Sequence, residues 1–254
     1  MLRLGRLVPI ALLIWLAGSC GSLTGPDDHR PTGTFRVLLI GNSLTYFNEL
    51  PALLESLADS AGVEDLYVQA VAYPDYGLGD HFAQGDALRE IRKGGWRFVV
   101  MQQGPSALPA SREYLLEWAS RFAVEIRAVG AIPAFYAVWP SADRAFDFDR
   151  VHESYALAAE AVDGALLPAG EAWRAAWRRQ ANLPLYGGDG FHPSVQGTYL
   201  AALVMLRRFY PGLSPVGLPA ALTLGGTTIP YVIPAQSAPI LQAAAVEAHT
   251  EFGR

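Results

Sequence analysis

Apolar segments of strand length that alternate with segments of helical periodicity restrict how this 254-residue chain can fold more than any other feature. The run VLLI, which begins at Val37, is apolar on both faces of an extended strand, as expected for a strand buried between two layers. Further strands are expected at LYVQAVAY, RFVVMQQ, IPAFYAVW and ALLPAG. Strands that alternate with helices predict βαβ units with right-handed crossovers. We therefore expect an α/β protein, a three-layer α/β/α sandwich with a central parallel sheet.

The helical segments are recognised by their apolar periodicity and by the residues at their ends. Asn48 is a candidate N-cap for the first helix, and Gly94 with Gly95 would end the second. The expected helices cover residues 49–61, 81–93, 111–129, 148–162, 171–180, 194–210 and 236–249. Before the last of them, the segment from Leu213 is rich in Pro and Gly, and the sequence leaves its role open.

The first 34 residues differ from the rest of the chain. Residues 1–20 carry Arg3 and Arg6 ahead of an apolar run too short for a stable membrane span, which is the layout of a secretory signal peptide. Residues 21–34 are polar, rich in Gly and Pro and without periodicity, which predicts a flexible tether. We expect residues 35–254 to form one domain.

The only cysteine of the chain, Cys20, lies at the end of the signal-like segment. The sequence LAGSC resembles a bacterial lipobox, in which the cysteine is lipidated and becomes the mature N-terminus. Ordinary signal-peptide cleavage beside an incidental cysteine is the alternative. We expect an exported protein of the cell envelope, held at the membrane by a lipid on Cys20.

Composition and missing motifs exclude several classes of partner. The net charge of −5 gives no basic surface for nucleic acid. Neither a P-loop nor G-x-G-x-x-G occurs, which argues against a nucleotide enzyme on a similar sheet. With one cysteine, an internal disulfide is impossible. The oligomeric state is left open.

The sequence GNS, which ends in Ser43, follows the first strand directly and places a small hydroxyl at its carboxyl end. Ligands of parallel sheets bind outside these strand ends, where the segment QQG at residues 102–104 is also expected. A tight turn that needs small residues would explain GNS without any function. The functional interpretation makes Ser43 a nucleophile, which requires a base, an orienting carboxylate and donors to an oxyanion.

A base and an orienting carboxylate both occur in the segment DGFHP, as Asp189 and His192. In a loop before a helix, an Asp three residues ahead of a His can fold back so that its carboxylate meets the imidazole. Pro193 suits the first turn of the following helix and stiffens this loop. The alternative is an Asp that caps a local turn beside a partly buried surface histidine.

An oxyanion needs N–H donors about 3 Å away, and several groups are candidates. The backbone N–H of Ser43 lies where the next helix begins, at the positive end of its dipole. Gly77 or Gly79, after the second strand, would let a backbone N–H approach a substrate. The carboxamides of Gln102 and Gln103 follow the third strand, and the sequence does not decide between them.

Taken in this order, the motifs resemble those of the SGNH/GDSL hydrolase superfamily. That family has G-D-S after the first strand, a glycine after the second, G-x-N-D after the third and D-x-x-H before a late helix. IGNSLT, Gly77, MQQGPS and DGFHP fall in these places, and the resemblance extends over about residues 35–210. It implies a flavodoxin-like α/β/α fold with Ser43 as nucleophile, His192 as base and Asp189 as its orienter, with no metal or cofactor.

Two motifs depart from the family pattern. Asn42 replaces the Asp of G-D-S, which is not part of the triad. The asparagine of G-x-N-D is absent, with Ser106 in its place, but QQGPS resembles the Gln-Gly of some carbohydrate-esterase branches, so a glutamine is expected to serve. Gly77 is preferred over the neighbouring glycine because Leu78 and His81 resemble an L-x-x-H that follows it in some branches.

Other interpretations of the chain are weaker. G-x-S-x-G is missing, so there is no α/β-hydrolase nucleophile elbow. The segment DFDRVHE, residues 147–153, lacks a recognised metal-ligand spacing and is interpreted as a capped helix start with a solvated face. Trp173 and Trp177, four residues apart, are expected to form one packed helix face rather than a sugar platform.

The sequence therefore predicts an exported serine esterase that hydrolyses small acyl esters, with acetyl groups on carbohydrate as the preferred substrate. A lipid-ester or thioester hydrolase is the alternative within this class. The alternative from another class is a surface lipoprotein that binds glycan with a non-catalytic hydrolase fold, which the altered third motif would explain. Aromatic residues expected near the site, and candidates to line its pocket, are Tyr46, Phe47, Tyr76 and Phe191.

Overall fold

Five parallel strands in the order β2-β1-β3-β4-β5 form the central sheet of the computed structural model. The structure describes residues 35–63, 65–225 and 230–253. The strands are β1 (Phe35–Gly41), β2 (Leu66–Ala72), β3 (Phe98–Met101), β4 (Ile132–Tyr136) and β5 (Ala165–Leu167). β1 lies between β2 and β3 and is buried from Arg36 to Gly41, which confirms the strand that the sequence predicts there.

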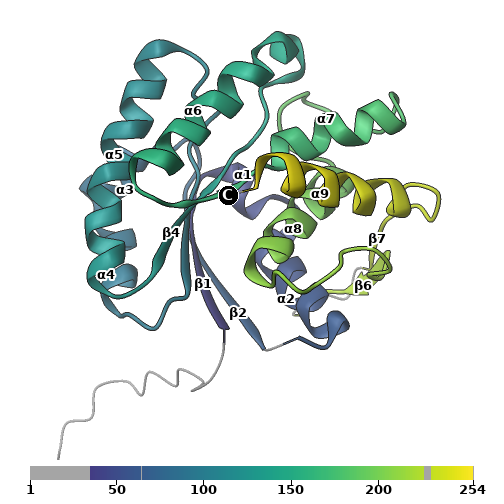
Figure 1. The fold of residues 1–254 in the computed structure, drawn as a ribbon, viewed down its shortest axis with the longest axis horizontal. Helices are drawn as coiled ribbons and strands as arrows, with labels where there is room; N and C mark the ends of the chain where they lie inside the picture. Colours follow the sequence, from purple (N-terminus) through teal and green to yellow (C-terminus); the bar gives the residue numbers. More distant parts are fainter. Residues whose placement is uncertain (1–34, 64, 226–229, 254) are drawn as a thin grey trace, which may run out of the picture. The chain divides into compact units, whose positions relative to one another are not determined.

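Helices cover both faces of this sheet, which confirms the three-layer α/β/α architecture (Figure 1). One layer contains α3 (Leu78–Gln84), α4 (Asp86–Arg92), α5 (Pro109–Ala128) and α6 (Phe148–Ala161). On the other face lie α2 (Leu50–Ala61), α7 (Ala169–Arg179), α8 (Val195–Phe209) and α9 (Ala238–Phe252). α8 packs against α2, α7 and α9, so it lies at the centre of its layer.

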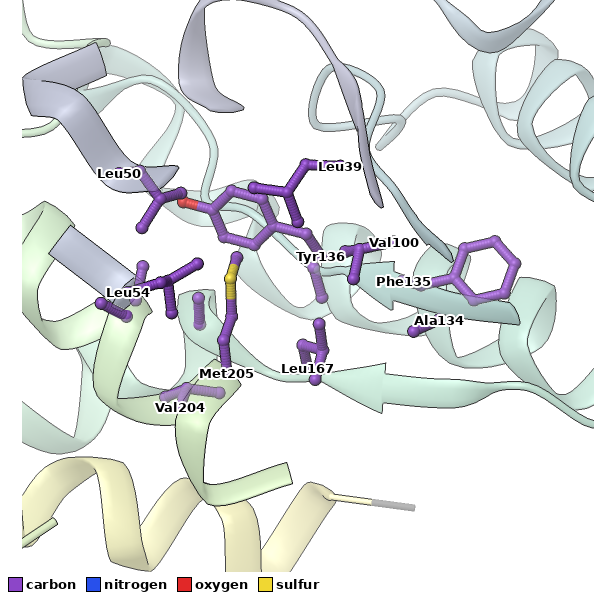
Figure 2. Close-up of a cluster of buried hydrophobic side chains, with 14 of the residues drawn as sticks. Leu39, Leu50, Leu54, Val100, Ala134, Phe135, Tyr136, Leu167, Val204 and Met205 are labelled. Atoms are coloured by element: carbon purple, nitrogen blue, oxygen red, sulfur yellow. The ribbon is translucent and has the colours of Figure 1, made fainter. Parts of the chain in front are cut away.

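The core between the sheet and α8 is formed by buried, mainly apolar side chains. Figure 2 shows Leu39, Val100 and Tyr136 of the sheet facing helix side chains from α2 and α8. These helix residues include Leu50, Leu54, Val204 and Met205, all buried. Because fully burying a leucine-sized side chain contributes about 1.5–3 kcal/mol, this layer anchors the strand ends that carry the site.

Two expectations about the helices are wrong. The helix expected over residues 81–93 is two helices, α3 and α4, because Gly85 between them takes a left-handed backbone conformation (φ 84°). Asn48 is not the N-cap of α2, whose N-cap is Glu49. The carboxamide of Asn48 is used elsewhere, since it donates to the carbonyl of Pro193 and to the hydroxyl of Thr198, each at 2.8 Å.

The segment after Leu213 contains a short antiparallel hairpin that was not predicted from the sequence. It is formed by β6 (Ala221–Thr223) and β7 (Pro230–Val232). Tyr231 of β7 is buried, and its hydroxyl donates to the carbonyl of Val195 at 2.9 Å, so the hairpin is fixed to the start of α8. Strands of three residues in a Pro- and Gly-rich segment carry too little alternation to be recognised.

The N-terminal expectations concern residues that the structure does not describe. The signal segment (1–20), with Cys20, and the tether (21–34) lie outside the described residues. Among those that are described, no helix has the length and apolar character needed to cross a membrane.

Candidate active site

Ser43 lies at the carboxyl end of β1 as the first residue of the short helix α1 (Ser43–Tyr46), seen in Figure 1 at the end of the sheet. Asn42 caps this helix, since its side-chain oxygen accepts the N–H of Leu44 at 3.2 Å. The other end of the same carboxamide donates to the carbonyl of Tyr76 at 3.2 Å. The residue that replaces the Asp of G-D-S therefore holds the nucleophile turn against the loop after β2.

The structure brings Ser43, His192 and Asp189 into one hydrogen-bonded chain, although Ser43 lies 149 residues before His192. The Ser43 hydroxyl lies 2.9 Å from His192 Nε2, and His192 Nδ1 lies 2.5 Å from Asp189 Oδ2. With the proton on Nδ1, the imidazole donates to the carboxylate and accepts from the hydroxyl. This is the arrangement in which a serine, a base and an orienting carboxylate act together.

Local hydrogen bonds fix the Asp189 carboxylate in this position. Its second oxygen accepts the backbone N–H groups of Phe191 and His192, at 3.0 and 2.9 Å. The hydrogen bond from the imidazole and these backbone bonds lower the pKa of Asp189 to about 2. Asp189 is therefore ionised at neutral pH and aligned with the ring.

The imidazole is also held from outside its own loop. Phe47 stacks on His192 with 4.4 Å between ring centroids. The indole of Trp139 donates to the carbonyl of Phe191 at 3.0 Å, and Trp139 in turn stacks on Trp173. Trp173 is thus a fully buried member of a packed helix face, as the sequence predicts, and it supports the loop from behind.

Gln102 has a different environment from that of an oxyanion donor. Its side-chain oxygen accepts the Asn42 N–H at 2.9 Å and the Thr45 hydroxyl at 2.8 Å. Its amide nitrogen donates to the carbonyl of Gln103, and the residue is 1% exposed. Gln102 therefore binds the nucleophile turn on both sides of Ser43, which the motif alone could not indicate.

The other predicted oxyanion donors are also engaged. The N–H of Gly77 donates to the Asp80 carboxylate at 2.8 Å, because Asp80 caps α3. The amide nitrogen of Gln103 donates to the Ser106 hydroxyl at 3.0 Å and the Ser111 carbonyl at 3.3 Å. The structure does not bring these donors together as free groups around Ser43. In contrast, the Ser43 N–H is the first of α1 and has no acceptor within its helix.

His81 holds the carboxyl end of β1, just before the turn that carries Ser43. It is fully buried, and its Nε2 donates to the carbonyl of Gly41 at 2.8 Å. Burial lowers the pKa of His81, so the neutral ring is favoured. Gly79, the alternative to Gly77, lies within α3, where an added Cβ would meet Tyr114 and Trp118.

The acidic residues of DFDRVHE are paired with arginines. Asp147 is fully buried and forms ion pairs with Arg144 and Arg150. Asp149 pairs with Arg174 at 2.7 Å. Within the described part of the chain, no group of acidic, His or Cys residues has the arrangement of a metal site.

Solved structures with the same architecture are known. A protein assigned as an SGNH hydrolase from Slackia heliotrinireducens is 27% identical over 68% of this chain and 97% of its own, with a TM-score of 0.56. A DUF4886 family protein from Bacteroides uniformis is 18% identical over 85% of this chain and 95% of its own, with a TM-score of 0.68. A catalytic mutant of an acetylxylan esterase from Geobacillus stearothermophilus is 16% identical over 70% and 95%, with a TM-score of 0.53. No protein-family model and no curated protein matches the chain.

The chain has the three-layer α/β/α fold of these structures, with its candidate site at the carboxyl ends of the strands. In the order of its motifs and in its fold the chain resembles the SGNH hydrolases, to which the Slackia heliotrinireducens protein is assigned.

Proposed function

We propose that this protein is a serine esterase in which Ser43 is the nucleophile, His192 the general base and Asp189 the orienting carboxylate. One observation supports the proposal above all: hydrogen bonds run without a break from the Asp189 carboxylate through the His192 imidazole to the Ser43 hydroxyl. A hydroxyl at neutral pH becomes nucleophilic only beside such a base, and the base needs its tautomer fixed at the far nitrogen. His192 provides the base, and Asp189 holds its far nitrogen.

Acylation begins when Ser43 Oγ attacks the ester carbonyl while His192 Nε2 takes the hydroxyl proton. The tetrahedral oxyanion lies at the start of α1, where the Ser43 N–H and the helix dipole stabilise it. His192 then gives its proton to the leaving alcohol, and the acyl group remains on Ser43. Asp189 stays ionised and stabilises the imidazolium throughout.

Deacylation repeats these steps with water as the nucleophile. His192 takes a proton from the water, which attacks the acyl carbonyl, and returns it to Ser43 Oγ as the carboxylic acid leaves. A second oxyanion donor becomes available when the Gly77 N–H leaves the Asp80 carboxylate, or when the Gln103 amide leaves Ser111. Such donors often align only when substrate is bound.

For the substrate we propose a small acyl ester, with an acetyl group on carbohydrate as first choice. An acetylxylan esterase is among the structures of the same fold, and the sequence resembles the Gln-Gly branch of carbohydrate esterases. A lipase/acylhydrolase from Enterococcus faecalis also has this fold, which keeps lipid esters and thioesters as the alternative. Export and a lipid anchor at Cys20 would bring the enzyme to such substrates at the cell envelope.

The test is hydrolysis of p-nitrophenyl acetate, butyrate and octanoate by wild type, Ser43→Ala and His192→Ala. We expect each substitution to lower kcat by at least about a thousandfold, because triad members act as a unit. Ser120→Ala, at an exposed serine of α5, is the matched control and should keep wild-type activity. Equal activity in all four proteins would exclude the triad.

A second candidate function is glycan binding without catalysis. It is favoured by one observation, the engagement of the Gly77, Gln102 and Gln103 donors in hydrogen bonds within the protein. Reaction with a fluorophosphonate probe separates the two candidates, since only an activated serine is labelled. If the folded wild type neither labels nor hydrolyses any of the esters, the binding function takes precedence.

A further inference from the structure

An apolar pocket of about 440 Å³ lies between the starts of α2 and α8 and the β6–β7 hairpin, elements that lie side by side in Figure 1. Its lining residues in the described part of the chain are Asn48, Glu49, Val195, Leu224, Pro230, Tyr231 and Val232. The volume and the mainly apolar lining are those of a small-molecule site.

Neither Ser43 nor His192 lines the pocket, but its lining residues are linked to the loop that carries His192. Val195 follows His192 by three residues, and Asn48 donates to the carbonyl of Pro193, the neighbour of His192. Phe47, next to Asn48, stacks on the imidazole. The residues that hold the imidazole are therefore continuous with those that line the pocket.

The walls of the pocket are built before any ligand binds. Tyr231 fixes the hairpin to the Val195 carbonyl, and Ile233 N donates to the Ala220 carbonyl at 2.7 Å. On the opposite wall, Asn48 and Glu49 both have left-handed backbones (φ 51° and 57°). Left-handed non-glycine residues are strained and cluster at ligand sites.

Part of the apolar surface in the pocket is exposed among the residues that the structure describes. Val195 is 37% exposed and Val232 is 55% exposed, whereas Leu224 and Tyr231 of the same lining are buried. Glu49, also exposed, adds one carboxylate to the lining. Such a pocket accepts an uncharged group with an apolar face and disfavours an anion.

We propose that this pocket binds the apolar part of the alcohol portion of the ester. The inference rests on the proposed function, in which His192 protonates the leaving alcohol. The alcohol therefore lies on the imidazole side of Ser43, where Phe47 stacks on the ring and its neighbour Asn48 lines the pocket. The acyl group, which remains on Ser43 after the alcohol leaves, lies away from it. The substrates selected are esters of uncharged alcohols that carry an alkyl, aryl or other apolar face.

The test compares two series of esters in wild type, Val195→Trp and Val232→Trp. One series changes the alcohol (methyl and 2-naphthyl acetate), and the other changes the acyl group (p-nitrophenyl acetate, butyrate and octanoate). We expect the variants to lower kcat/KM for 2-naphthyl acetate about tenfold or more, and for methyl acetate only slightly. Within the acyl series, all three esters should be affected by the same factor. Val124→Trp, at an exposed position of α5 outside the pocket, is the matched control and should change neither series.

Binding of free 2-naphthol to the Ser43→Ala protein, followed by fluorescence, tests the pocket without catalysis. If the double variant Ser43→Ala, Val195→Trp binds 2-naphthol more weakly than Ser43→Ala does, the proposal is supported. Equal binding by the two proteins overturns it. An effect that grows with acyl chain length would assign the pocket to the acyl group instead. If Ser43→Ala hydrolyses these esters as fast as wild type, it is the proposed function that fails, whatever the result with naphthol.

Discussion

Gly41 has no room for a side chain, and this shapes the nucleophile turn. A Cβ there would lie 2.2 Å from Thr45 Oγ1 and 2.4 Å from Gln102 Oε1. Without it, the Gln102 oxygen reaches both the Asn42 N–H and the Thr45 hydroxyl. Ser43 lies between these two contacts along the chain, so the position of its hydroxyl depends on β3 as well as β1.

Thr45→Val should lower kcat for p-nitrophenyl acetate about tenfold, because it keeps the shape of the side chain but removes its bond to Gln102. Misplacing a catalytic group by about 1 Å can cost a hundredfold, and the Asn42 contact that remains should limit the loss. Thr45→Ser retains the hydroxyl and should restore most of the activity. A serine variant as impaired as the valine variant would argue for packing rather than the hydrogen bond.

The low pKa of Asp189 gives a pH dependence whose sign is defined. Its pKa is about 2 in the folded protein, mainly through the hydrogen bond from His192, and about 4 in an unfolded chain. The folded state therefore binds this proton more weakly, so the interaction stabilises the fold above about pH 4 and is lost as the pH falls towards 2. We expect the stability difference between wild type and Asp189→Asn to shrink from about pH 5 to about pH 2 in urea unfolding. The side chain is half exposed, so the effect is small, and a difference that grows on acidification would contradict it.

The N-terminal end of α3 has a capping role and is also a candidate site for oxyanion binding. Asp80 caps it through the Gly77 N–H, which is also a predicted oxyanion donor. If Gly77 binds the oxyanion, helix capping and oxyanion binding compete for one N–H group.

Asp80→Ala should lower the free energy of unfolding by about 1 kcal/mol, the usual contribution of a cap. The same change should raise kcat for p-nitrophenyl acetate a few fold if Gly77 stabilises the oxyanion, because its N–H becomes free. Asp80→Asn keeps an acceptor and should leave both quantities near wild type. A kcat that falls in Asp80→Ala would remove Gly77 from the proposed mechanism.

Periodicity was sufficient to predict the five parallel strands and most helices, because their apolar residues repeat clearly. It could not predict the break at Gly85, since a single glycine is compatible with a continuous helix or with a left-handed junction. Motif order likewise predicted that Ser43, Asp189 and His192 would lie together. The oxyanion donors could not be assigned in this way. Whether the Gly77 N–H or the Gln103 amide is free depends on contacts with Asp80 and Ser111, which no motif contains.

For the molecule as a whole, α8 connects the site loop to the core. Gly197, in its first turn, lies so close to its surroundings that a Cβ would be 2.3 Å from the Leu185 carbonyl and 2.6 Å from the Trp173 ring. Trp173 stacks on Trp139, which holds the loop of His192. Packing in the centre of the layer and geometry at the site are therefore coupled.

Gly197→Ala should lower the free energy of unfolding by about 1–3 kcal/mol, the usual cost of overpacking, and should also lower kcat. Urea unfolding and p-nitrophenyl acetate hydrolysis measure the two effects. Gly212→Ala, where an added Cβ meets nothing within 4 Å, is the control and should change neither. A stable Gly197→Ala protein would show that α8 can move away from Trp173 without loss.

The proposed base, His192, and Asp189 lie three residues apart in one loop, whereas Ser43 lies 149 residues from the histidine. The Asp189–His192 pair is thus a short-range contact that a largely unfolded chain can still form. The contact with Ser43 requires the strand, the helix layer and the loop at once. The extent of labelling of Ser43 by a phosphonate should therefore equal the fraction of native molecules. This one side chain could thus report folding during refolding experiments or in cell extracts.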